Sequence, residues 1–227
     1  MNDNSSAFNS KAYNEEILRT IPFYLEIQEQ ITGLVQMLNK DHISWLDTGC
    51  GTGTLALAAA QACPVSEFVL CDPSRSMLQS AKQTLSSCKA RCAFSHCSSQ
   101  KLSYSERFDV VTAVQAHHYL SMQERLVATK NCYAALKPEG MYITFENFAP
   151  ATSTGTDLLL NRWRQFQVQQ GKTEEEAKKH IERYGTDYFP ITVSAQLFLL
   201  RQCGFTTVEL FWLSHLQAGF FALKPPA

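Results

Sequence analysis

The sequence predicts an α/β domain whose sheet is mainly parallel. From residue 43 to residue 146, short apolar runs typical of strands alternate with stretches that have helical spacing. Strands separated by single helices need crossover connections, and such connections are right-handed and place the strands parallel. The last two strand-like runs, 206–212 and 217–223, are joined by a turn too short for a crossover. We therefore expect this final pair to be antiparallel.

The predicted elements follow one another in a regular order. Residues 13–38 form two helices divided by Pro22, because proline removes a backbone donor and ends a helix. Strands are then expected at residues 43–47, 67–71, 91–95, 108–113 and 141–146. Helices are expected at residues 54–62, 74–85, 123–136 and 193–202, and the sequence KPEG at 137–140 is expected to separate the third of them from the strand that follows.

Residues 147–190 interrupt this alternation with two further helices, at 156–170 and 173–184. The second begins with a capping box formed by Thr173 and Glu176. This segment is expected to be an insertion that covers a site, and residues 1–40 are expected to form an N-terminal helical cap. Because the chain has neither a repeat nor a Pro/Ser-rich linker, residues 1–227 are predicted to form one domain.

The composition narrows the classes of protein to which the chain belongs. Of its 227 residues 45% are hydrophobic and 18% are charged, which predicts a folded globule, and its net charge of −1 gives no overall attraction to nucleic acid or membrane. No apolar run is long enough to span a bilayer and no secretory leader is recognisable, so a cytoplasmic protein is expected. The eight cysteines contain no CxxC pair, so we expect reduced thiols and no metal site.

Residues 45–57 read WLDTGCGTGTLAL, which is typical of a strand, a glycine turn and a helix start. Gly49, Gly51 and Gly53 let the backbone approach a ligand closely, so a nucleotide-like cofactor is expected. Dinucleotide enzymes favour GxGxxG, and here Thr54 stands at the third glycine position. Asp72 ends the next strand, where a carboxylate accepts hydrogen bonds from a ribose diol. NAD-binding proteins share that feature, so these residues alone leave the cofactor open.

Four segments, in order along the chain, resemble the successive motifs of class I S-adenosylmethionine-dependent methyltransferases: WLDTGCGTG, LCDPSRSML, FDVVTAVQAHHYL and LKPEGMYITFEN. This resemblance covers nearly the whole chain. It implies a Rossmann-like fold with a seven-stranded, mainly parallel sheet whose last strand is antiparallel and whose two faces carry helices. It also implies S-adenosyl-L-methionine as the cofactor and S-adenosyl-L-homocysteine as its product.

The same resemblance assigns residues to the cofactor site. It implies that the glycine turn faces the methionine and ribose, that Asp72 holds the ribose hydroxyls, and that the segment after Asp72 borders the adenine. The remaining positions lie at the adenine ring or at the edge between cofactor and substrate. The full set, apart from the N-terminal cap, is Asp47, Gly49, Cys50, Gly51, Gly53, Asp72, Pro73, Met77, Ser98, Ser99, Val114 and Gln115.

Both ends of the chain, AYNEEILRTIPFYLEI and GFTTVELFWLSHLQAGFFALK, are similar to the subgroup that includes the tRNA wobble-uridine carboxymethyltransferases. This similarity implies that Tyr24 reaches the cofactor from the cap. The chain departs from those enzymes in two ways: its glycine turn is complete, and no arginine in residues 175–190 aligns with the one expected to pair the extra carboxylate. Both departures favour ordinary S-adenosylmethionine and leave carboxymethyl transfer to tRNA as an alternative.

Methyl transfer needs orientation and desolvation more than a strong base, so the chain need not contain a catalytic base. His117, His118 and Glu146 are the candidates, because they follow strands at the edge where such folds bind ligands. Packing under a helix is the alternative role for the histidines, and a helix-cap role is the alternative for Glu146. The base-methyltransferase motifs Asn/Asp-Pro-Pro-Tyr/Phe and Pro-Cys are absent from the sequence.

The insertion carries charges of both signs at helical spacing, which is typical of a solvated face rather than a phosphate-binding surface. Its aromatic residues are expected to seat it on the core. The leading hypothesis is methyl transfer to a small-molecule acceptor, and the sequence is compatible with a homodimer. The alternatives are a tRNA-directed carboxymethyl- or methyltransferase, a non-catalytic S-adenosylmethionine-binding module and an NAD-dependent oxidoreductase.

Overall fold

A computed structural model describes residue 8, residue 10 and residues 12–227; the part of the predicted cap at residues 1–7, 9 and 11 lies outside the described residues. One seven-stranded sheet has the order β3-β2-β1-β4-β5-β7-β6. Its strands are β1 (Ile43–Thr48), β2 (Val65–Asp72), β3 (Arg91–His96), β4 (Phe108–Val114), β5 (Leu136–Asn147), β6 (Thr207–Ser214) and β7 (Gln217–Leu223).

The pairing of the strands confirms the predicted fold class. Strands β1 to β5 are joined in parallel, whereas β7 lies antiparallel between β5 and β6. The direction in which successive strands are added to the sheet reverses between β1 and β4. These two strands are parallel, so their carboxyl ends lie at the same edge of the sheet. In an open α/β sheet, the carboxyl ends of the strands at such a reversal form a crevice where ligands bind.

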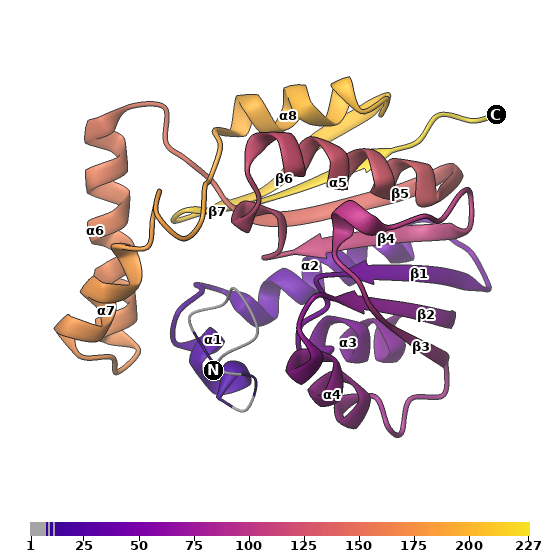
Figure 1. Cartoon of the computed structure of the whole chain (residues 1–227), viewed down its shortest axis with the longest axis horizontal. Helices are drawn as coiled ribbons and strands as arrows, with labels where there is room; N and C mark the ends of the chain where they lie inside the picture. Colours follow the sequence, from indigo (N-terminus) through magenta and orange to yellow (C-terminus); the bar gives the residue numbers. More distant parts are fainter. Residues whose placement is uncertain (1–7, 9, 11) are drawn as a thin grey trace.

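Helices cover both faces of the sheet (Figure 1). On one face α2, α3 and α4 pack a buried core against the strands, and on the other face α5 and α8 do the same. Short 3-10 helices η1 and η2 follow β3 and β4. The helices are α1 (Tyr13–Leu18), α2 (Tyr24–Gln36), α3 (Thr54–Ala62), α4 (Arg75–Thr84), η1 (Ser99–Lys101), η2 (His117–Tyr119), α5 (Met122–Ala135), α6 (Ser153–Gln169), α7 (Glu174–Ile181) and α8 (Val193–Gln202).

Strand β5 begins earlier than the sequence pattern predicted. The KPEG segment was expected to be a turn, but α5 ends at Ala135 and the strand starts at Leu136. Glu139 takes a left-handed φ of 61°, and its backbone N–H donates to the carbonyl of Lys224, 3.2 Å away. A Cβ at Gly140 would lie only 2.8 Å from the carbonyl oxygen of Lys137. The segment therefore bends within the strand instead of leaving it.

The predicted insertion forms helices α6 and α7, and the capping box between Thr173 and Glu176 is present. In the view of Figure 1, α1 lies between α7 and the sheet. Phe23, at the start of α2, also takes a left-handed φ of 59°, which turns the chain between α1 and α2 after Pro22. Among the described residues, no helix combines the length and apolar character needed to cross a membrane.

Candidate active site

A cavity of about 290 Å³ opens at the carboxyl edge of the sheet, where the strand order reverses. Segments that follow β1, β2, β3 and β4 form its walls, and α1 closes it from above the sheet edge. The lining residues are Tyr13, Gly49, Gly51, Asp72, Pro73, Met77, Ser98, Ser99, Gln100, Val114, Gln115, Ala116, Tyr119 and Leu120. Nine of the thirteen residues that the sequence assigned to the cofactor lie on this wall.

The glycine turn after β1 has a backbone that only glycine adopts easily. Gly49, Gly51 and Gly53 have φ angles of 72°, 54° and 79°, all in the left-handed region. A Cβ at Gly49 would lie 2.5 Å from the Cβ of Ala116, and one at Gly53 would press on α4 at Ala81. At Gly51 no described atom lies within 4 Å of the same position. Because Gly51 also lines the cavity, a ligand there can contact the peptide backbone directly.

Asp72 ends β2 on the wall of the cavity and is only 6% exposed. Its Oδ2 accepts a hydrogen bond of 2.9 Å from the backbone N–H of Gly51, and its Oδ1 accepts one of 2.8 Å from Ser74. These bonds fix the carboxylate against the glycine turn. Because each carboxylate oxygen accepts more than one hydrogen bond, Asp72 can also bind a pair of hydroxyl groups, as the predicted ribose contact requires.

The side of the cavity beyond Asp72 is built by α4 and η1. Ser74 caps α4 by accepting a hydrogen bond of 3.1 Å from Met77 N, and the buried Met77 lines the cavity. The hydroxyls of Ser99 and Thr48 lie 2.9 Å apart, and Asn131 donates to the Ser99 carbonyl at 3.1 Å. Apolar Met77 beside hydrogen-bonded serines is a surface suited to a flat heterocycle with polar edges.

Four of the predicted cofactor residues do not line the cavity. Tyr24 lies behind it, with its hydroxyl 3.3 Å from Thr54 Oγ1. Asp47 is buried and accepts a 2.7 Å hydrogen bond from Thr112, and burial raises its pKa to about 7. Cys50 is buried in the turn, while Gly53 starts α3. These positions support the shape of the turn, and their direct contact with a ligand stays a prediction.

Five further residues line the same cavity, and the sequence patterns did not single them out: Tyr13, Gln100, Ala116, Tyr119 and Leu120. Tyr13 comes from α1, whose apolar spacing gave it only a place in the cap. Ala116, Tyr119 and Leu120 belong to the segment after β4, where Gln115 and the two histidines drew the attention. Its place directly after His117 and His118 was the available signal for Tyr119.

A second, smaller chamber of about 20 Å³ adjoins the cavity and shares Tyr13, Gln115 and Tyr119 with it. Residues of the cap and of the insertion surround the chamber. Its volume is close to that of one water molecule, so the cap and the insertion leave no room there for a larger ligand. The remaining lining residues are Phe8, Ile17, Thr20, Ile21, Asn147, His180, Arg183 and Tyr188.

Arg183 supplies the formal positive charge among the described side chains that line the chamber. Its Nε lies 2.7 Å from Asp187 Oδ2, and its guanidinium lies 6.0 Å from the centre of the Tyr188 ring. Burial raises the pKa of Tyr119, and the charge of Arg183 together with a hydrogen bond from it partly offsets that rise. The sequence pattern placed Arg183 on a solvated helix face, but the chain after α7 turns it toward the chamber.

His117, His118 and Glu146 line neither cavity, and all three are almost fully buried. His118 Nδ1 lies 2.6 Å from Glu146 Oε2. The two oxygens of Glu146 also accept the backbone N–H groups of His117 at 2.9 Å and His118 at 3.1 Å. Burial alone would raise the pKa of Glu146, but the hydrogen bond and charge of His118 hold it below its usual value. This geometry fixes the segment that carries Gln115 and Tyr119.

Two histidines with lowered pKa values make the protein sensitive to acid. Burial lowers the pKa of His117 to about 4 and that of His180 to about 3, from 6.5. Between pH 6.5 and these values the histidines are protonated in the unfolded chain but neutral in the native state, so the free energy of unfolding falls as pH falls. The slope is up to about 1.4 kcal/mol per pH unit for each histidine.

We expect His180→Phe to reduce this slope, because His180 packs against the rings of Phe8 and Trp163 and its Nδ1 has no hydrogen-bond partner among the described residues. Urea unfolding at pH 7, 6 and 5 measures the slope. His42→Asn is the control, because His42 is exposed. An unchanged slope in the His180→Phe variant would contradict the prediction.

Comparison with known proteins agrees with the fold. Residues 46–140 match a family described as "Methyltransferase domain". Carboxy-S-adenosyl-L-methionine synthases are similar to this chain over nearly its full length. The protein from a Nitratiruptor species is 25% identical over 218 residues, which cover 95% of this chain and 90% of that one. The protein from Trichodesmium erythraeum is 24% identical and covers 96% and 88%.

Solved structures share the fold. The 1,6-didemethyltoxoflavin-N1-methyltransferase from Burkholderia thailandensis, solved with 1,6-didemethyltoxoflavin and S-adenosylhomocysteine, superposes with a TM-score of 0.67 at 14% identity. That match covers 95% of this chain and 84% of the other. At this identity the similarity establishes the fold alone. Together, the matched methyltransferase domain, the relatives that span the chain and the shared architecture support a class I S-adenosylmethionine-dependent methyltransferase.

Proposed function

We propose that this enzyme transfers the methyl group of S-adenosylmethionine to a small-molecule acceptor that binds in the smaller chamber. The observation that carries the proposal is the adjacency of two cavities that share Tyr13, Gln115 and Tyr119. One lies on the glycine turn and Asp72, as a nucleoside-type cofactor needs. The other lies beneath the cap and the insertion, and so is suited to a metabolite rather than to an open strand of nucleic acid.

The residues of the larger cavity fit the cofactor. Gly51 leaves room for it, and Asp72 presents two fixed carboxylate oxygens at the position expected for the ribose hydroxyls. Met77 and Ser99 form the adenine end, while Gln115 and Tyr119 stand at the end shared with the chamber. When bound, S-adenosylmethionine supplies an activated methyl group on a sulfonium.

The protein contributes orientation and exclusion of water to the transfer. Gln115 takes a left-handed φ of 52°, and its backbone N–H donates to Phe145 O at 2.6 Å, so its side chain is held at the junction of the two cavities. Tyr13 and Tyr119 border the same junction from α1 and η2. Burial raises the pKa of both phenols, which therefore stay protonated and can donate hydrogen bonds near neutral pH.

The lining of the chamber favours a neutral or anionic acceptor. The described residues on its wall include no aspartate or glutamate, whereas Arg183 is one of them. His180 stays neutral near pH 7, because burial lowers its pKa to about 3. Ile17, Ile21 and Tyr188 supply apolar and aromatic surface, so the acceptor is expected to combine an apolar or flat body with a polar group.

Formation of a carboxylated S-adenosylmethionine is the second candidate. Relatives that span the chain are carboxy-S-adenosyl-L-methionine synthases, so their product carries an additional carboxylate. Arg183 lies beside Tyr119 at the boundary between chamber and cofactor cavity, where a guanidinium can pair with such a carboxylate. The insertion thus contains an arginine that sequence alignment did not reveal.

Mass spectrometry separates the candidates. The purified protein would be analysed for cofactor retained from the cell and then incubated with S-adenosylmethionine and a panel of small neutral and anionic acceptors. Formation of S-adenosylhomocysteine that depends on an acceptor supports methyl transfer. A retained sulfonium heavier by one carboxyl group supports the second candidate. Tight cofactor binding without turnover of any acceptor would instead indicate a binding module.

Replacement of Asp72 by alanine tests the cofactor position. We expect the affinity for S-adenosylhomocysteine to fall about tenfold to a hundredfold, because a charge-assisted pair of hydrogen bonds is lost. Isothermal titration calorimetry measures the change. Asp41→Ala is the control, since Asp41 is exposed and lies before β1, away from the cavity. Equal affinity in a folded Asp72→Ala protein would show that the cofactor binds elsewhere.

A further inference from the structure

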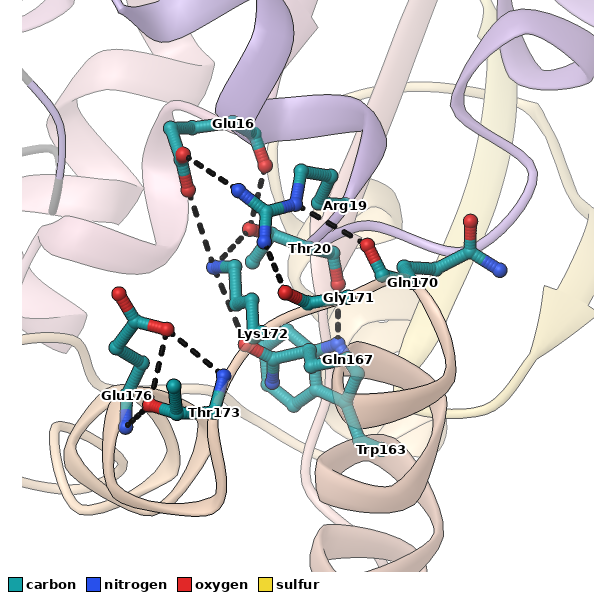
Figure 2. A network of polar contacts seen from close by, with 10 residues as sticks. All are labelled: Glu16, Arg19, Thr20, Trp163, Gln167, Gln170, Gly171, Lys172, Thr173 and Glu176. Carbon is teal, nitrogen blue, oxygen red and sulfur yellow. Dashed lines mark hydrogen bonds and ion pairs between the residues drawn. The ribbon is translucent and has the colours of Figure 1, made fainter.

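The N-terminal helix α1 and the insertion hold each other through a network of polar contacts (Figure 2). Trp163 Nε1 donates to the carbonyl of Thr20 at 2.6 Å. Arg19 Nε donates to the carbonyl of Gln170 at 3.1 Å, and the guanidinium also donates to the carbonyl of Gly171. Residues more than 140 positions apart in the sequence are therefore joined at the point where the cap meets the lid.

Lys172 is the centre of this network and is only 6% exposed. Its Nζ donates to Thr20 Oγ1 at 2.6 Å and to Gln167 Oε1 at 3.4 Å, and it lies 3.6 Å from Glu16 Oε2. The ring of Phe8 covers it at 4.7 Å. Desolvation lowers the pKa of Lys172, and the charge of Glu16 partly offsets that change.

The partners of this ammonium come from both segments. Glu16 and Thr20 belong to α1 and the turn after it, whereas Gln167 belongs to α6. If α1 moved without the insertion, a buried cation would lose its hydroxyl and carboxylate partners, and the buried Trp163 N–H would lose its acceptor. Unpaired buried groups of this kind are costly, so separate motion of the two segments is disfavoured.

The two segments also border different parts of the site. Tyr13, on α1, lines the cofactor cavity, while His180 and Arg183 bring the insertion to the chamber. The chamber is too small in this closed arrangement to admit an acceptor larger than water, so the lid has to open. If α1 and the insertion are linked, movement of α1 at the cofactor cavity also moves the insertion at the chamber.

We propose that α1 and residues 163–172 of the insertion open and close as one lid, and that Lys172 is the positioning residue that couples them. Closure of Tyr13 over the cofactor then also closes the insertion over the acceptor chamber. This inference rests on the cofactor position proposed above. Residues 163–172 do not line the cofactor cavity, so any response of that segment to the cofactor must pass through α1 or the chamber.

Hydrogen exchange measured by mass spectrometry tests the coupling in the full-length protein, with S-adenosylhomocysteine as the probe. In the parent, the probe should slow exchange both in residues 13–20 and in residues 163–172. In Lys172→Met, protection should remain in residues 13–20 and be lost in residues 163–172. Without the probe, this variant should exchange at least about tenfold faster in both segments, because charged hydrogen bonds join them.

The matched control is Lys179→Met, since Lys179 is an exposed lysine in the same insertion. Lys172→Arg, which keeps the charge, should restore part of the coupling. If Lys172→Met does not fold, Arg19→Ala removes two of the contacts from a side chain that is 38% exposed and should weaken the same transmission.

Protection of residues 163–172 that persists in Lys172→Met, or that is absent in a parent shown by calorimetry to bind the probe, would overturn the coupling. Faster exchange of residues 163–172 alone in the unliganded variant would overturn it as well. Failure of the cofactor assignment is a separate result, since calorimetry would then detect no binding of S-adenosylhomocysteine. Hydrogen exchange of the parent and Lys172→Met without the probe would still test whether the two segments move together.

Discussion

Gly51→Val is expected to abolish useful binding of S-adenosylmethionine, lowering affinity at least about a hundredfold. A Cβ at this position meets no described protein atom within 4 Å, so the valine methyl groups would occupy the space of the cofactor. The φ of 54° also strains any residue with a side chain, by about 1–2 kcal/mol. A shift of the turn would in addition disturb the N–H that Gly51 donates to Asp72.

Gly185→Val separates the two causes. Gly185 has a φ of 77° and likewise has no described atom within 4 Å of its Cβ position, but it lines neither cavity. Both variants should lose about 1–2 kcal/mol of stability through strain. Only Gly51→Val should lose affinity for S-adenosylhomocysteine in calorimetry. Binding by Gly51→Val as tight as that of the parent would move the cofactor out of this cavity.

Much of the fold was predictable, because its signals are local. Apolar runs bounded by Gly, Pro and Asp marked the strands, and the short connection before residue 217 required the antiparallel β7. Pro22 correctly separated α1 from α2. The KPEG segment misled the prediction, since Pro138 and Gly140 are typical of a turn. Pairing of the flanking Leu136 and Met141 with β4 and the hydrogen bond from Glu139 to Lys224 keep the segment in β5.

The residues that line the larger cavity were partly predictable, because several of them directly follow strands. Gly49, Gly51 and Asp72 stand at fixed distances from strand ends, so topology alone brings them together. Tyr13 and Arg183 come from segments whose positions depend on tertiary contacts, such as those of Arg19 and Lys172. Charge alternation in the insertion predicted a solvated surface, and nothing local showed that Lys172 would be buried.

For the two histidines, position in the sequence suggested a functional role that tertiary contacts do not support. His117 and His118 follow a strand at the ligand-binding edge, which favoured a role as general base. In the structure Glu146, the third candidate, accepts the backbone N–H groups of both histidines and pairs with one ring nitrogen of His118. A carboxylate placed in this way holds the segment between Gln115 and Tyr119, which borders both cavities, while Glu146 itself lines neither of them.

Glu146→Gln is therefore expected to lower the free energy of unfolding by about 3–5 kcal/mol, as is typical when one member of a buried ion pair is removed. The Gln amide N–H groups would face backbone N–H donors, and His118 would lose the carboxylate that lies 2.6 Å away. Urea unfolding at pH 7 measures the loss. Glu209→Gln is the control, because Glu209 is exposed on β6.

The pH dependence of this difference identifies its cause. The pKa of Glu146 is lowered from 4.5 in the native protein, so its charge stabilises the fold above the unfolded value, and that contribution is lost as pH falls through the native value. The gap between parent and variant should therefore narrow below about pH 4.5. A Glu146→Gln protein as stable as the parent but unable to transfer methyl groups would instead assign the carboxylate to the chemical step. Loss of stability together with weaker binding at both cavities is the result that a purely positioning role requires.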